Sequence, residues 1–191
     1  MRHIRSAARE EVVAHYIASE LNRVVEHADA GEVPDAAFLG LPASPSEGAL
    51  QHMSRVLLCD LRKHSWLYDQ FWARVGRWSL VKLRPDEIDV MPIGGPADKW
   101  HYPKLDAFVR DLQAAANAGV PIPNLPDDPA YLLQLRPELA LKRIILIKGD
   151  YAGRMFEYAI GDGAHRAVAL AVNGVAELDA YWGIQYGSES H

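Results

Sequence analysis

The apolar residues of this chain recur with a helical period in its first part. Over residues 6–30 they fall every three or four positions, and Gly31 follows this stretch, which is the pattern of an amphipathic helix and its end. A second stretch with the same period runs from Pro45 to about residue 74 and begins with a capping-box pattern and a proline at the first helical position. We therefore predict a pair of helices within residues 1–77.

The hydrophobic pattern of the second part mixes strands with helices. Residues 79–83 form a short apolar run typical of a strand, and a polar turn follows them. A third helix is predicted between Pro103 and Gly119, and a short helical segment over residues 129–135. The apolar stripe that the third helix should bury consists of Leu105, Phe108, Val109, Leu112 and Ala116.

The last part of the chain reads as a hairpin, a helix and a final strand. Residues 143–148 and 154–160 are apolar and β-prone, and the turn-forming residues 149–153 lie between them. A helix over residues 164–173 and a strand over residues 177–184 follow. The hairpin strands should therefore lead directly into the last helix.

This order of elements predicts an α+β fold. A small mixed sheet with helices should occupy residues 78–191, and the N-terminal helical pair should cover it. The chain has 191 residues, of which 49% are hydrophobic, so it can bury the core of one domain of ordinary size. We expect the two parts to form one compact unit.

Composition also indicates in which cellular compartment the protein is expected and which partners it is expected to bind. Cys59 is the only cysteine, so no disulfide can form within the chain, and no Cys/His pattern has zinc-site spacing. The sequence holds no apolar run of about 18 residues. We expect a cytoplasmic protein without membrane insertion.

The formal net charge of −5 argues against a protein whose whole surface binds nucleic acid. A local basic groove is compatible with this charge.

The junction between the hairpin and the last helix carries the clearest candidate chemistry. Gly161, Asp162 and Gly163 end the predicted strand, so the first N–H groups of the helix point outward and its dipole adds partial positive charge. Arg166 adds a planar fork of donors suited to phosphate, and His165 adds a group that can donate or move a proton near neutral pH. The two glycines could let a ligand approach the backbone closely.

An ordinary turn explains the same residues without a ligand. Asp162 would then cap the helix, and Arg166 would be a solvated side chain. A cation in the first turn of a helix is, however, repelled by the helix dipole at a cost of about 0.3–1 kcal/mol. Its position therefore favours a compensating anion.

The order of these elements resembles the signature of the ParB/sulfiredoxin superfamily. In that signature a strand is followed by Asp-Gly-x-His-Arg, an alanine-rich helix and a further strand, and the matching positions here are Gly163, His165 and Arg166. Residues 80–88 are similar to the opening strand and turn of that domain, and the resemblance covers residues 78–184. It implies a nucleotide-phosphate pocket at the glycine motif.

Departures from the signature narrow the implied activity. Ala164 stands where sulfiredoxins have their catalytic cysteine, so sulfinic acid reduction is not expected. Partition proteins continue into a helix-turn-helix domain, whereas this sequence ends at residue 191. The chain is most similar to the stand-alone Osa-type plasmid fertility inhibition, or oncogenic suppression, proteins. The resemblance implies an ATPase and DNase that blocks DNA transfer through a type IV secretion system.

The resemblance also assigns roles to the motif residues. Gly161, Asp162, Gly163 and Ala164 would surround the phosphates of ATP, Arg166 would neutralise charge in the transition state, and His165 would orient or protonate the leaving oxygen. Glu87, in the turn after the opening strand, would act as a base or hold Mg²⁺, with Asp162 as a second metal ligand. The alternatives are a solvated turn for Glu87 and a helix cap for Asp162.

Basic residues around the hairpin form a candidate DNA surface. They could contact the DNA backbone through its phosphates, or they could simply be solvated charges. They are Lys142, Arg143, Lys148 and Arg154.

Two other functions remain open. A free serine kinase could use the same phosphate pocket, with Glu87 as the base for the substrate hydroxyl. A non-catalytic inhibitor could block a component of a type IV secretion system by surface contact.

Overall fold

The structure is a computed structural model of the whole chain. It describes residues 1–9, 11–12, 15–16, 74–90, 104–122, 129–134, 143–151 and 154–187, without the side chains of Tyr151 and Arg154.

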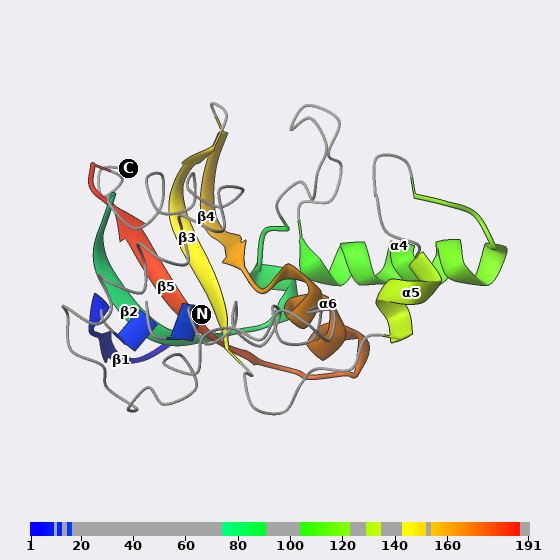
Figure 1. Cartoon of the computed structure of the whole chain (residues 1–191), viewed down its shortest axis with the longest axis horizontal. Helices are drawn as coiled ribbons and strands as arrows, with labels where there is room; N and C mark the ends of the chain where they lie inside the picture. Colours follow the sequence, from blue (N-terminus) through cyan, green and yellow to red (C-terminus); the bar gives the residue numbers. More distant parts are fainter. Residues whose placement is uncertain are drawn as a thin grey trace, which may run out of the picture.

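Within these residues, five strands form one mixed sheet in the order β1-β2-β5-β3-β4 (Figure 1). Neighbouring strands are antiparallel except β3 and β5, which are parallel. The strands are β1 (Arg2–Ala7), β2 (Val75–Leu83), β3 (Ile144–Tyr151), β4 (Arg154–Asp162) and β5 (Leu178–Gln185).

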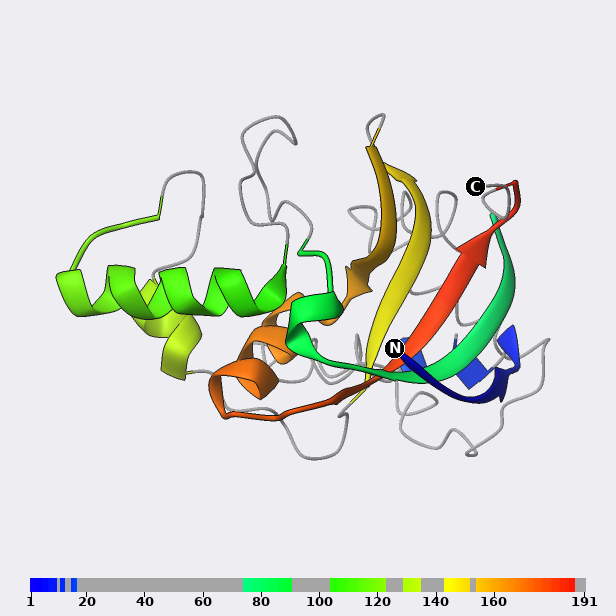
Figure 2. The same cartoon turned by 180° about the vertical axis from the view of Figure 1, so that it is seen from behind.

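Among the described residues, three complete α-helices and one 3-10 helix accompany the sheet. They are η3 (Pro85–Glu87), α4 (Leu105–Ala118), α5 (Pro129–Gln134) and α6 (Ala164–Val172). The α-helices pack against one another and lie toward the β4 side of the sheet in both views, whereas β1 lies at the opposite edge (Figures 1 and 2). The described part of the chain is thus an α+β fold.

The two faces of the sheet bury different sets of residues, because side chains alternate along a strand. The face toward the helices, here called the helical face, contributes Val81, Leu83, Ile144, Leu146, Leu178 and Ala180 to a core shared with α4 and α6. The opposite face buries Leu80, Ile145, Ile147 and Tyr181. His15 contacts the Tyr181 ring, so this histidine lies over the second face.

Several predicted elements are confirmed. Helix α4 begins at Leu105, and Gly119 follows it with a φ of 65°, the left-handed conformation that ends many helices. Helix α5 and the succession of β4, α6 and β5 also follow the prediction. One core residue was assigned wrongly, since Ala115 rather than Ala116 completes the buried stripe of α4.

The N-terminal residues differ from the prediction. Ser6 and Ala7 were expected to begin a helix but belong to β1, where they pair with Ser79 and Trp78 of β2. Most of β1 is exposed, so no apolar alternation marks it, and backbone pairing with β2 determines its conformation. The described residues that are helical in this segment are Arg9, Glu11, Val12, His15 and Tyr16.

Other parts of the N-terminal prediction lie outside the described residues. These parts are the remainder of the first predicted helix and the second predicted helix up to residue 73. Strand β2 begins at Val75 rather than at residue 79.

The hairpin turn is shorter than predicted. Gly149, Asp150 and Tyr151 belong to β3 and pair with Phe156, Met155 and Arg154 of β4. Antiparallel pairing extends through these turn-forming residues, because cross-strand hydrogen bonding outweighs their local preference for a turn.

No helix in the described residues is both long enough and apolar enough to cross a membrane.

Candidate functional site

The sheet topology brings two polar turns to one end of the sheet. Strand β2 ends where β5 begins, because Leu83 pairs with Leu178, and β3 begins beside β5 at the same end. Strand β4 ends there too, since Asp162 pairs with Ile145. The acidic turn (residues 84–89) after β2 and the glycine turn (residues 161–166) after β4 therefore share this end.

Gly163 is the N-cap residue of α6, and its φ is 84°. It has no side chain that could accept a hydrogen bond from the first N–H groups of the helix. Asp162 does not take the N-cap position proposed for it, because it is the last residue of β4. The start of α6 is therefore capped by a glycine backbone.

The glycines of this turn make room for the protein's own side chains. A Cβ on Gly163 would lie 3.1 Å from Ile144 Cγ2 and 3.2 Å from Arg166 Nη1. A Cβ on Gly161 would lie 3.3 Å from Ile147 Cδ1. Close approach by a ligand was predicted at both glycines, and in the structure the nearest neighbours of their Cβ positions are side chains of β3 and α6.

The two basic residues of the first helical turn lie in different environments. His165 is exposed, whereas Arg166 is partly buried. The Arg166 guanidinium donates from Nη1 to the backbone carbonyl of Arg143. His15 Nε2 lies 3.0 Å from that same carbonyl oxygen. Arg166 is thus anchored beside the start of β3, and His165 faces solvent.

A polar network on the opposite face of the sheet surrounds this carbonyl. We call Glu11, His15, Arg143, Tyr181 and Arg166 the Tyr181 cluster. Arg143 Nη1 donates to Tyr181 Oη at 2.9 Å, and Tyr181 Oη donates to Glu11 Oε1 at 2.7 Å. The Arg143 guanidinium also lies over the Tyr181 ring, 5.4 Å from its centroid, in a cation–π contact.

Burial and charge shift two pKa values in this network. The pKa of His15 is lowered to about 4, mainly because burial disfavours the charged imidazolium, and the charges of Arg166 and Arg143 lower it further. The pKa of Glu11 is lowered to about 2, mainly because the Arg5 side chain donates hydrogen bonds to it. At neutral pH His15 is therefore uncharged and Glu11 is ionised.

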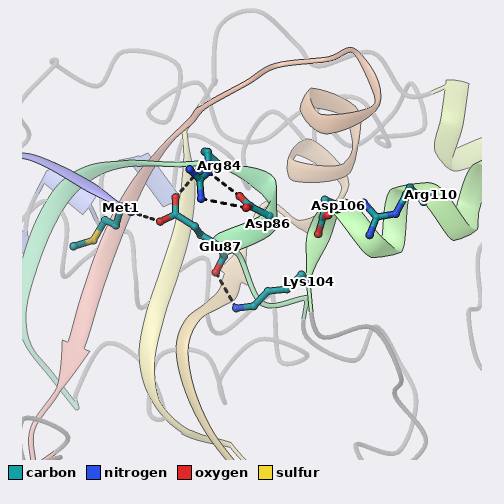
Figure 3. Close-up of polar contacts among 7 residues, drawn as sticks. All are labelled: Met1, Arg84, Asp86, Glu87, Lys104, Asp106 and Arg110. Carbon is teal, nitrogen blue, oxygen red and sulfur yellow. Dashed lines mark hydrogen bonds and ion pairs between the residues drawn. The ribbon is translucent and has the colours of Figure 1, made fainter.

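The acidic turn is held together by its own contacts (Figure 3). One carboxylate oxygen of Glu87 binds the N-terminal ammonium of Met1, and the other accepts the backbone N–H of Arg84 at 2.9 Å. These contacts hold the pKa of Glu87 below its usual range. The Arg84 guanidinium donates to both oxygens of Asp86, at 3.0 and 3.2 Å. Both oxygens of the proposed base Glu87 thus have structural partners.

Asp89 is a buried carboxylate that the sequence pattern did not single out. It is 7% exposed and accepts hydrogen bonds from Lys104 Nζ at 2.8 Å and from the backbone N–H of Tyr158 at 3.2 Å. Lys104 also donates to the Glu87 carbonyl at 3.1 Å. These contacts join the acidic turn, the start of α4 and β4. The only sequence signal was its position between the apolar residues Ile88 and Val90.

The described part of the chain includes the side chains of two residues of the predicted DNA surface, Arg143 and Lys148. Arg143 is bound to Tyr181, and Lys148 makes a 3.0 Å ion pair with Glu157. Lys142 and the side chain of Arg154 lie outside the described part. Arg143 and Lys148 therefore interact with different partners.

The described residues also contain no group of three or more histidine, cysteine, aspartate or glutamate side chains arranged to hold a metal ion. The pair proposed for Mg²⁺, Glu87 and Asp162, is therefore not part of such a group. Asp162 lies partly buried at the end of β4.

Comparisons of the chain with protein-family models, with curated proteins and with solved structures found no match.

Proposed function

We propose that this chain binds the phosphates of a nucleotide at the glycine turn, as a protein of the ParB/sulfiredoxin type. In this proposal it is a cytoplasmic ATPase and DNase that inhibits conjugative DNA transfer through a type IV secretion system. The observation that supports it most directly is the start of α6, where a glycine cap precedes His165 and Arg166 in the first helical turn.

Three physical features favour an anion at this position. The N–H groups of the first turn point out from the start of the helix, and the dipole of this nine-residue helix adds partial positive charge there. The N-cap residue Gly163 provides no side-chain acceptor for those N–H groups. The adjacent Tyr181 cluster adds the guanidinium of Arg143, which donates to a neutral phenol. A phosphate would complement all three.

The residues of the turn then have distinct roles. The amides that follow Gly163 would hold a phosphate, and Arg166 would stabilise the negative charge that develops during its transfer. The exposed ring of His165 would orient or protonate the leaving oxygen. Glu87 has no catalytic role in this scheme, because both of its carboxylate oxygens are engaged.

The described carboxylates do not provide a ready site for Mg²⁺. No step of the proposed reaction is therefore assigned to a protein-bound metal ion. Mg²⁺ would arrive as part of the nucleotide complex, where it is held chiefly by phosphate oxygens.

Calorimetric titration tests the phosphate site directly. ATP, CTP and ADP are titrated with and without Mg²⁺ into the wild-type protein, Arg166→Ala and Arg110→Ala. Arg110 is a matched control, because it is an exposed arginine of α4 that pairs with Asp106 (Figure 3). Arg166→Ala should weaken nucleotide binding on the order of tenfold or more, and Arg110→Ala should leave it unchanged. Equal binding by all three proteins contradicts the proposal.

Product analysis distinguishes the proposed activity from its alternatives. Release of inorganic phosphate together with nicking of plasmid DNA supports the ATPase and DNase. Formation of phosphoserine from serine and nucleotide would instead identify a kinase. If Arg166→Ala abolished hydrolysis but still inhibited conjugative transfer, the protein would be a non-catalytic inhibitor.

A further inference from the structure

A single backbone carbonyl connects the N-terminal segment to the glycine turn. The carbonyl oxygen of Arg143 accepts a hydrogen bond from Arg166 Nη1 and lies 3.0 Å from His15 Nε2. A carbonyl oxygen has two lone pairs and only accepts hydrogen bonds, so it can bind both groups, and His15 must donate from Nε2. Residues from three segments of the chain thus meet at one atom.

Tyr181 holds His15 and Arg143 in place around that atom. Tyr181 is 1% exposed, and its ring makes an edge-to-face contact with His15 at a centroid distance of 5.3 Å. Its hydroxyl binds both the Arg143 guanidinium and the Glu11 carboxylate. The His15 imidazole therefore contacts both the buried Tyr181 ring and the Arg143 carbonyl, and the Arg143 side chain is bound to the same tyrosine.

The positive charges near His15 favour an uncharged hydrogen-bond donor at this position. Arg143 and Arg166 both face the imidazole with positive charge, and the Tyr181 cluster contains one carboxylate, Glu11, which also binds Arg5. Among the described residues, Arg143 makes no ion pair with a carboxylate. Because the pKa of His15 is lowered to about 4, the ring donates its hydrogen bond at neutral pH without adding a third positive charge.

We propose that His15 is a positioning residue of the phosphate site: by sharing the Arg143 carbonyl with Arg166, it holds the Arg166 guanidinium in the orientation that meets a phosphate. This inference rests on the proposed function. An arginine side chain loses conformational freedom when it is fixed, so an anchor that orders it before binding improves affinity. The N-terminal segment, which lies outside the superfamily resemblance, thereby becomes part of the site.

A double-mutant cycle tests this coupling. ATP affinity is measured by calorimetric titration for the full-length wild-type protein, His15→Asn, Arg166→Ala and the double variant. Asparagine is too short to place its amide at the position of Nε2, so His15→Asn should weaken ATP binding on the order of fivefold. The double variant should bind no more weakly than Arg166→Ala, because the effect of His15 acts through Arg166.

A conservative variant separates positioning from a general structural role. The amide of His15→Gln reaches about as far as Nε2 and can donate to the Arg143 carbonyl, so this variant should recover ATP affinity to within about twofold of wild type. Urea unfolding of every variant verifies that it is folded at the temperature of the titration. If His15→Asn does not fold, His15→Leu replaces it in the same cycle.

The outcomes distinguish this inference from the function on which it rests. If the wild-type protein binds ATP and His15→Asn binds it equally well, the inference is overturned and the proposed function stands. Additive losses in the double variant also overturn it, because His15 would then act independently of Arg166. If the wild-type protein does not bind ATP, the proposed function fails and the inference fails with it.

Discussion

The acidic turn and the glycine turn lie at the same end of the sheet, but they hold their charges in different ways. In the acidic turn every carboxylate has a partner that donates to it: Asp86 binds Arg84, Glu87 binds the Met1 ammonium, and Asp89 binds Lys104. In the glycine turn and the adjacent Tyr181 cluster, Arg166 donates to a neutral carbonyl and Arg143 to a neutral phenol.

This difference separates a structural region from a candidate binding region. Ion pairs within the acidic turn neutralise its charges and connect β2, α4 and β4. The Arg143 carbonyl and the Tyr181 hydroxyl orient two guanidinium groups near the start of α6, where the proposed phosphate would add negative charge. The four predictions below test this distinction, beginning with the largest expected effect.

Asp89→Ala should strongly destabilise the protein. The substitution removes the charge-assisted bond to Lys104 and leaves the N–H of Tyr158 without its carboxylate acceptor, so the free energy of unfolding should fall by about 3–4 kcal/mol. Urea unfolding measures this change. Asp86→Ala is the control, since Asp86 is an exposed residue of the same turn and its loss should not measurably alter stability. Equal effects of the two substitutions would contradict a structural role for the buried carboxylate.

Acidification should destabilise the protein through His15. The unfolded chain takes up a proton at His15 near pH 6.5, whereas the folded protein resists protonation until about pH 4. The contribution of uncharged His15 to the free energy of unfolding is therefore fully present above pH 6.5. It is lost as the pH falls from 6.5 toward 4, and the free energy of unfolding falls by about 2–3 kcal/mol. Urea unfolding at several pH values measures the slope. His15→Gln cannot titrate and should flatten the curve in this range; an unchanged slope would assign the effect to other groups.

Gly163→Ala should destabilise the fold and also disturb Arg166. The φ of 84° is strained for alanine, and the new Cβ would crowd Ile144 and the Arg166 guanidinium, so the free energy of unfolding should fall by about 1–2 kcal/mol. Gly174→Ala is a matched control, because Gly174 has a φ of 75° and nothing within 4 Å of its Cβ position. Both variants should lose stability, but only Gly163→Ala should weaken ATP binding. Equal ATP binding by the two variants would argue against a phosphate at the glycine turn.

The contrast between the two turns also shows what local sequence pattern can predict. Helix α4 was predicted closely because its apolar period and its closing glycine are local signals. The location of the glycine turn between β4 and α6 was predicted for the same reason. Strand β1 was not predicted, since a strand that is exposed over most of its length has no apolar alternation, and its pairing partners lie 71–80 residues away along the chain.

The partners of the charged residues could not be predicted from local pattern. The bond between Arg166 and the Arg143 carbonyl, and the approach of His15 to the same oxygen, depend on how β3, α6 and the N-terminal segment pack together. The pairing of Asp89 with Lys104 likewise depends on where the chain enters α4. Sequence therefore identified Arg166 as a candidate but not the atoms that hold it.

Glu87→Gln should have the smallest effect, and it tests the role that the superfamily resemblance gave to this residue. Glutamine keeps an oxygen that can accept the Arg84 N–H and loses only the ion pair with the Met1 ammonium, so the free energy of unfolding should change by less than about 1 kcal/mol. Nucleotide hydrolysis should stay within about threefold of wild type, because a carboxylate with both oxygens engaged and a lowered pKa is a weak base. A loss of hydrolysis of about a hundredfold or more would instead be typical of a catalytic base. The acidic turn would then be part of the active site, and the distinction between the two turns would no longer hold.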